Sequence, residues 1–161
     1  MSDAHLCFRG GGSPDWVPAF AGTQRQLRWG IAGFGWVARD YMVPGIEAAG
    51  GEVVAIADPS PIAQPSAEST SMLAFDDTAA MLASAEVDAL YVATPNHLHL
   101  PPVQAAAAAG VPVLCEKPLA ATLADAEAIV AACEGLLAGT AFDQRYHPAH
   151  RAMAEPQGDD A

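Results

Sequence analysis

The sequence predicts an α/β domain built on a doubly wound, mostly parallel sheet of about six strands. From Leu27 onward, short apolar runs alternate with segments of helical periodicity, the pattern of strands joined by crossover helices. The apolar runs are nearly continuous, as expected of strands that are covered on both faces. A chain of 161 residues with 16% charged residues also has enough apolar surface for one such core.

The expected strands are the six apolar runs, each bounded by turn residues or by a helical segment. In chain order they are Arg28–Gly33, Glu52–Asp58, Met72–Phe75, Val87–Thr94, Val111–Glu116 and Thr140–Asp143.

The first helix should follow the first strand, and it contains a proline. Pro44 removes a backbone N–H and crowds the carbonyl group of Asp40. We therefore expect this helix to form two pieces.

Two further helices have clear end signals. Pro101 and Pro102 suit the first turn of a helix that runs through an alanine-rich segment to Gly110, which can end it in the left-handed conformation. Thr122 and Asp125 have the spacing of a capping box, and apolar residues follow at helical spacing: Ala126, Ile129, Val130, Cys133 and Leu137.

The ends of the chain differ in composition from its centre. Residues 1–26 are rich in glycine and proline and show no periodicity, so we expect a flexible leader. Residues 27–150 form the predicted domain, and residues 151–161 are a polar, turn-rich tail.

The charge balance argues against nucleic acid and membrane partners. Seven basic residues against 19 acidic ones give a net charge of −12, which repels phosphate backbones and anionic lipids. No apolar stretch approaches the roughly 20 residues that span a bilayer. Three cysteines without a CxxC pair or a secretory leader favour the cytoplasm.

A glycine motif follows the first strand. Gly33, Gly35 and Ala38 form GxGxxA between a strand and a helix. Gly33 permits a tight turn, Gly35 lets the backbone approach a pyrophosphate, and Ala38 allows close packing of helix on strand. The alternative is a strand-to-helix turn that binds nothing. If the motif does bind phosphates, the contacts come from the segment Gly33, Phe34, Gly35, Trp36 and Val37 at the positive end of the helix.

An acid at the end of the second strand supports a Rossmann-type dinucleotide site. Asp58 lies 23 residues beyond Gly35, where a carboxylate can bind the adenosine ribose, although a turn former before Pro59 would look the same. A carboxylate there repels the 2′-phosphate of NADP, and no Lys or Arg occurs between Arg39 and Lys117. We therefore expect NAD rather than NADP, with Arg39 as the basic residue that could reverse the preference.

Two further loops follow the fourth and fifth expected strands. Thr94-Pro95-Asn96 and Glu116-Lys117-Pro118 both come at carboxyl ends, the edge at which doubly wound sheets bind ligands. Together with the glycine motif and the segment 142–148, these loops resemble the glucose-fructose oxidoreductase and inositol dehydrogenase (Gfo/Idh/MocA) family over roughly residues 27–153. The resemblance implies nicotinamide-dependent oxidation of sugars, cyclitols or related polyols.

The resemblance also implies residue roles. Lys117 would be the catalytic residue, beside the nicotinamide and the substrate hydroxyl, relaying a proton or stabilising an oxyanion. A desolvated lysine would suit both roles. The cofactor ribose and carboxamide would be lined by Thr94, Asn96, His99 and Glu116. Loop and cap contacts are the alternative for these four, and no metal ligand is expected, because the His97 and His147 pairs lack companion acids or cysteines at ligand spacing.

The family continues after its nucleotide domain into an α+β substrate domain, which this chain is expected to lack. The leading hypothesis is thus a truncated, NAD-binding part of a dehydrogenase that acts on a polyol only when a second domain completes it. The alternatives are a redox-sensing or dinucleotide-binding module that acts through a partner protein, and a nonfunctional gene remnant. Whether the chain is an enzyme by itself, and its oligomeric state, stay open.

Overall fold

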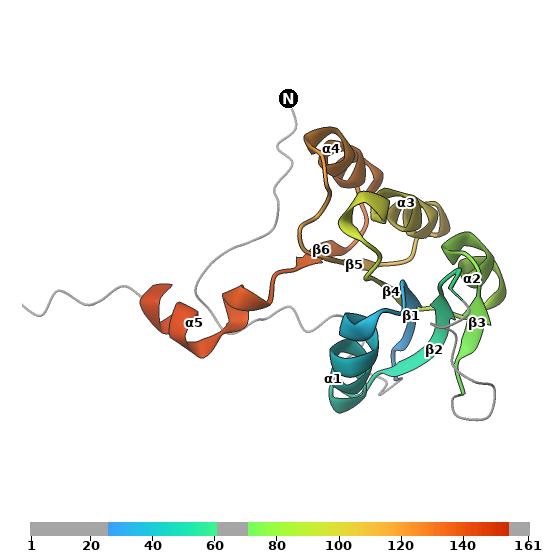
Figure 1. Cartoon of the computed structure of the whole chain (residues 1–161), viewed down its shortest axis with the longest axis horizontal. Helices are drawn as coiled ribbons and strands as arrows, with labels where there is room; N and C mark the ends of the chain where they lie inside the picture. The colour runs from blue at the N-terminus through green and yellow to red at the C-terminus, as the bar shows by residue number, and fades with distance from the viewer. Residues whose placement is uncertain (1–25, 61–70, 155–161) are drawn as a thin grey trace, which may run out of the picture.

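The protein forms one six-stranded, fully parallel sheet in the order β3-β2-β1-β4-β5-β6. The structure, a computed structural model, describes residues 26–60 and 71–154 (Figure 1). The strands are β1 (Arg28–Ala32), β2 (Glu52–Ala57), β3 (Leu73–Phe75), β4 (Ala89–Val92), β5 (Val113–Glu116) and β6 (Ala138–Ala141). The strand order changes direction between β1 and β4, so the predicted doubly wound α/β fold is confirmed.

Helices cover both faces of the sheet. One face carries α2 (Thr78–Ser84), α3 (Leu100–Ala109) and α4 (Leu123–Ala132), whereas α1 (Val43–Ala48) packs on the other face (Figure 1). The short helices are a π-helical turn η1 (Ala38–Met42) and two 3-10 turns, η2 (Asn96–Leu98) and η3 (Asp143–Tyr146). The last helix, α5 (Pro148–Ala154), extends away from the sheet (Figure 1).

The first helix forms two pieces, as Pro44 predicts. The N–H of Val43 donates to the carbonyl oxygen of Ala38, five residues earlier, so the turn before the proline is π-helical. Pro44 then lies in the first turn of α1, where its missing N–H leaves no bond unmade. A wide turn thus accommodates the proline, and the two pieces, η1 and α1, follow one another without a gap.

The predicted helix ends are mostly correct. Thr122 accepts a hydrogen bond from the N–H of Asp125 at 3.1 Å, and Gly110 ends α3 with φ +68°. The apolar stripe predicted to run to Leu137 is wrong, because α4 stops at Ala132 and the chain turns at Gly135, φ +77°. Leu137, beyond the end of α4, is 72% exposed, and Val130, within α4, is 53% exposed.

The sixth strand begins two residues earlier than predicted. The expected strand Thr140–Asp143 is instead β6 at Ala138–Ala141, and Asp143 begins η3. The parallel register with β5, which pairs Val113 with Ala138, sets its start. The expected leader lies outside the described residues apart from Gln26, and the boundary expected at residue 150 falls inside α5.

An ion pair fastens β1 to the segment before β4, at the edge where the strands begin. The guanidinium of Arg28 donates to both carboxylate oxygens of Asp88 at 3.0 Å and also contacts Glu86. The Arg28 N–H donates to Asp88 as well, at 3.0 Å. Within residues 26–60 and 71–154, no helix has the length and apolarity to cross a membrane.

Candidate functional site

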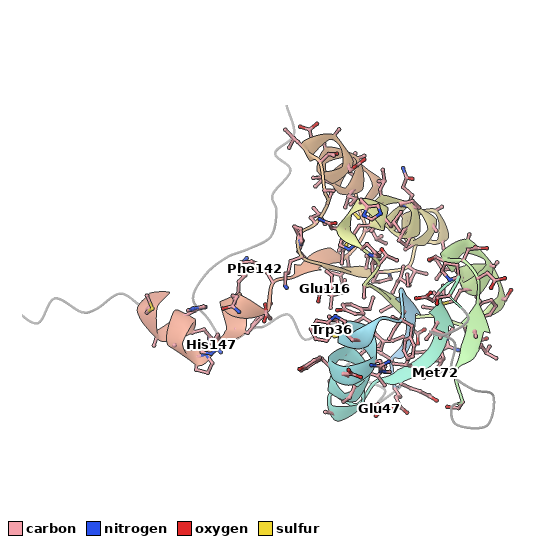
Figure 2. All side chains as sticks on the ribbon, in the orientation of Figure 1. Trp36, Glu47, Met72, Glu116, Phe142 and His147 are labelled. Carbon is pink, nitrogen blue, oxygen red and sulfur yellow. The ribbon has the colours of Figure 1, made fainter. Side chains whose placement is uncertain are left out.

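The predicted site residues gather where β1, β2, β4 and β5 end. Because these strands are parallel neighbours, the loops that follow them share one edge of the sheet. The edge lies opposite the Arg28 ion pair. Figure 2 labels Glu116 and Trp36, which come from β5 and from the start of the first helix.

The fold itself requires a glycine at position 33. It has φ +85°, and its N–H donates to the carbonyl oxygen of Ala57 at 2.8 Å. A Cβ at this position would lie 2.6 Å from the Thr94 nitrogen and 2.8 Å from the Ala93 carbonyl carbon. The turn after β1 is therefore held tightly against the end of β4, and only glycine fits.

The fold of the described residues does not require a glycine at position 35. It does not have a positive φ, and a Cβ built on it meets no atom of the described residues within 4 Å. Trp36 and Val37 follow it at the start of the helix, where backbone N–H groups have no partner within the helix and the helix dipole is positive. The open side of the loop thus combines free space with a region that attracts anions.

Asp58 ties the end of β2 to this loop. One carboxylate oxygen accepts from the N–H of Phe34 at 2.8 Å, and the other accepts from the N–H of Ser60 at 2.8 Å. The Phe34 ring belongs to the core and is 7% exposed. The Phe34 side chain is therefore not available to a ligand. The Phe34 backbone N–H already donates to Asp58.

The exposed side of the first helix carries an aromatic pair. Trp36 is 64% exposed and meets the ring of Tyr41 edge to face, with 5.8 Å between centroids. Arg39, in the same helix, donates to the carboxylate of its neighbour Asp40 at 2.7 Å and 3.2 Å.

The loop after β4 contains three of the predicted residues. The Thr94 hydroxyl donates to the carbonyl oxygen of Leu98 at 3.1 Å, and half-buried Asn96 begins η2. His99, by contrast, is 1% exposed, and its two ring nitrogens lie 2.9 Å from the Thr94 oxygen and 3.0 Å from the Leu119 oxygen. Both polar atoms of this ring thus face the protein.

Glu116 and Lys117 follow β5. The buried hydroxyl of Tyr91 donates to Glu116 Oε1 at 2.7 Å, and the N–H of Lys117 donates to Oε2 at 3.0 Å. Burial, with the adjacent carboxylate, raises the pKa of Tyr91 well above its ordinary value. The Lys117 side chain is exposed in the described chain, and the Lys117–Pro118 bond is cis.

Sequence reasoning did not single out Tyr91. The available signal is a hydroxyl-bearing ring in an otherwise aliphatic strand, Ala89–Val92, whose neighbouring strand ends in an acid. The same region buries the thiol of Cys115, and burial raises its pKa to about 12. In the described part of the chain, no three His, Cys, Asp or Glu side chains are grouped so that they could hold a metal ion.

The sequence is similar to a known family of oxidoreductases. Residues 27–137 match the Gfo/Idh/MocA family, described as an oxidoreductase family with an NAD-binding Rossmann fold. The 1,5-anhydro-D-fructose reductase of Ensifer adhaerens is 42% identical over 132 residues, which cover 80% of this chain and 40% of the relative. The chain therefore spans about 40% of that relative's length.

Two solved structures have the same fold. The WlbA dehydrogenase of Bordetella pertussis, in complex with NADH and UDP-GlcNAcA, superposes with a TM-score of 0.73 and 31% identity over 80% of this chain and 40% of its own. KijD10, a 3-ketoreductase of Actinomadura kijaniata in complex with TDP-benzene and NADP, gives a TM-score of 0.71 and 31% identity over 80% of this chain and 42% of its own. Structures with this fold thus carry either cofactor.

Proposed function

Because the chain belongs to the Gfo/Idh/MocA oxidoreductase family, as an NAD(P)-binding Rossmann domain, we propose that it binds NAD across the ends of β1, β2 and β4 and presents Lys117 to a polyol or sugar substrate. The observation that carries this proposal is the contrast between the two glycines of the loop. The described residues fill the space beside Gly33 but leave the space beside Gly35 open.

The diphosphate lies beside Gly35 in this proposal. A chain with net charge −12 has few cations to hold phosphate, so the binding has to come from backbone N–H groups and the helix dipole. The amides of Gly35, Trp36 and Val37 are at the start of the helix and supply both. The Phe34 amide contributes indirectly, because its hydrogen bond to Asp58 holds the loop in place.

Asp58 binds the adenosine ribose and favours NAD. Among the described residues, each carboxylate oxygen has one backbone partner and retains capacity to accept a ribose hydroxyl. Arg39, in the first helix, is paired with Asp40, which reduces its value as a partner for a 2′-phosphate. A fixed negative charge at the ribose selects against NADP, because it repels the 2′-phosphate.

Lys117 acts on the substrate hydroxyl. Bound nicotinamide would supply the hydride chemistry at the carbon that bears the hydroxyl. The Lys117 amine takes up the hydroxyl proton or stabilises the oxygen as charge develops on it. Thr94 and Asn96, in the loop after β4, orient the nicotinamide ribose and carboxamide, while Glu116 holds the Lys117 backbone.

We propose the oxidation of a polyol or sugar only for a site in which further structure holds the substrate beside Lys117 and the cofactor. Lys117 is exposed in the described chain, and hydride transfer needs a substrate held beside both amine and cofactor. We therefore expect the 161-residue chain to bind NADH and to oxidise polyols slowly or not at all.

Titration calorimetry with NADH and NADPH tests the cofactor site. We expect saturable NADH binding, with NADPH at least tenfold weaker, equivalent to about 1.4 kcal/mol. Arg28→Gln, at the opposite edge of the sheet, is the control that should bind NADH like the wild type. No saturable binding of either dinucleotide would reject the function, and tighter NADPH binding would reject the assigned preference.

A polyol panel tests the chemistry separately. NADH formation should be near the background rate with inositols, xylose and glucose as substrates. Rapid turnover that survives in a Lys117→Ala variant would contradict the role given to this residue.

A further inference from the structure

Two buried aromatic rings with polar atoms form hydrogen bonds to residues that come before and after Lys117 in the sequence. Among the described residues, Tyr91 and His99 are the buried residues whose aromatic rings carry an oxygen or a nitrogen, with exposures of 0% and 1%. Burying such atoms is unfavourable unless each finds a hydrogen-bond partner. Tyr91 finds its partner just before Lys117, and His99 finds one of its partners just after it.

Tyr91 acts on the residue before Lys117. Its hydroxyl donates to Glu116 Oε1 at 2.7 Å, and Oε2 of the same carboxylate accepts the N–H of Lys117 at 3.0 Å. The ring itself is fixed, since it lies in β4 and packs in the core beneath α1. The orientation of the Lys117 peptide is thereby linked to a central strand of the sheet.

His99 acts on the residue two positions after Lys117. One ring nitrogen lies 3.0 Å from the Leu119 carbonyl oxygen and the other 2.9 Å from the Thr94 carbonyl oxygen. Carbonyl oxygens only accept hydrogen bonds, so a ring with protons on both nitrogens donates to both, and a ring with one proton donates to one. The loop after β4 and the loop after β5 are thus bridged through one side chain.

We propose that Tyr91 and His99 are positioning residues that hold segment 116–119 from both ends and thereby set where Lys117 stands relative to the loop after β4. This inference rests on the proposed catalytic role of Lys117. Neither ring can touch a substrate or cofactor directly, because neither is more than 1% exposed. Their influence on the reaction therefore passes through Glu116 and Leu119.

Lys117 is the only lysine in the sequence, which makes the proposal directly measurable. A chain grown with 15N-lysine gives a single backbone amide resonance, and that N–H is itself the donor to Glu116. Its chemical shift and its hydrogen-exchange rate report the state of the segment without any cofactor or substrate.

Tyr91→Phe is the cleanest variant, because it removes one oxygen and keeps the ring. We expect the Lys117 amide resonance to move and its exchange to become roughly fivefold faster, the equivalent of one net hydrogen bond of about 1 kcal/mol. His99→Leu should shift the same resonance and speed its exchange by at least as much. His99→Gln, whose amide nitrogen carries two hydrogens, should lie between His99→Leu and the wild type.

Arg28→Gln is the matched control, since it breaks an ion pair at the other end of the strands. It should leave the Lys117 resonance in place even where it lowers thermal stability. A Lys117 signal that is unchanged in Tyr91→Phe and His99→Leu, or that moves equally in Arg28→Gln, overturns the proposal. If His99→Leu does not fold, Tyr91→Phe decides alone.

The outcome is separable from that of the cofactor proposal. Failure of the wild type to bind NADH would reject the proposed function while leaving the Lys117 amide data intact. Unchanged amide data would reject the positioning role while NADH still binds.

Discussion

Alanine at Gly33 should lower the stability of the fold, whereas alanine at Gly35 should lower the affinity for the cofactor. Gly33→Ala places a Cβ at φ +85°, which costs about 1–2 kcal/mol in that conformation. The new carbon would also lie 2.6–2.9 Å from backbone atoms of Ala93 and Thr94, which cannot give way without moving the end of β4. We expect a loss of at least about 2 kcal/mol, or a melting temperature lower by about 8 °C.

Gly35→Ala should leave the fold unchanged. Its Cβ meets no atom of residues 26–60 and 71–154 within 4 Å, so the free energy of unfolding should stay within about 0.5 kcal/mol of the wild type. The methyl group nevertheless enters the space assigned to the diphosphate. NADH affinity should therefore fall at least tenfold, or about 1.4 kcal/mol.

Thermal melts and NADH titrations on both variants test the pair. A Gly35→Ala protein that binds NADH like the wild type would show that the diphosphate does not lie beside this glycine. A Gly33→Ala protein with an unchanged melting temperature would refute the clash inferred between a Cβ at this position and the backbone of Ala93 and Thr94.

Three further predictions concern other residues. Asp58→Asn should reduce the preference for NADH over NADPH roughly tenfold in parallel titrations, because it removes the charge that repels a 2′-phosphate; an unchanged ratio would contradict the ribose assignment. Arg28→Gln should lower the melting temperature, less so in high salt, because its ion pair with Asp88 is lost, and a melt that matches the wild type at low salt would argue against a stabilising role. The Cys115 thiol, with its pKa raised to about 12, should be ionised in about one molecule in ten thousand at pH 8, so mass spectrometry should find it alkylated only under unfolding conditions.

The sequence predicts the sheet well because the signal for each strand is local. Continuous apolar runs mark β1, β2, β4 and β5, and the glycine motif marks the turn after β1. The start of β6 was missed because it depends on pairing with β5 rather than on its own composition, which is Ala-Gly-Thr-Ala. The end of α4 was missed because apolar spacing continued past Gly135, where the backbone turns.

The side-chain partners at the site could not be predicted in the same way. The Phe34 amide meets Asp58 across 24 positions, the Tyr91 hydroxyl meets Glu116 across 25, and the His99 ring meets Leu119 across 20. Each pair exists because strand order brings distant loops to one edge. Residue type and strand position indicate that a polar group lies at this edge, but not whether it faces a ligand or another loop.

The hydrogen-bond capacity that a polar group retains distinguishes a group that can bind a ligand from one that only joins two loops. Among the described residues, the Asp58 carboxylate has one backbone partner on each oxygen, and a carboxylate oxygen can accept a second bond, so a place for a ribose is consistent with these contacts. The two nitrogens of His99 each face a carbonyl oxygen, and a ring nitrogen serves one partner at a time. A buried ring with both positions occupied has no polar atom left for a ligand, so we expect His99 to affect the proposed dinucleotide site only through the loops that it joins.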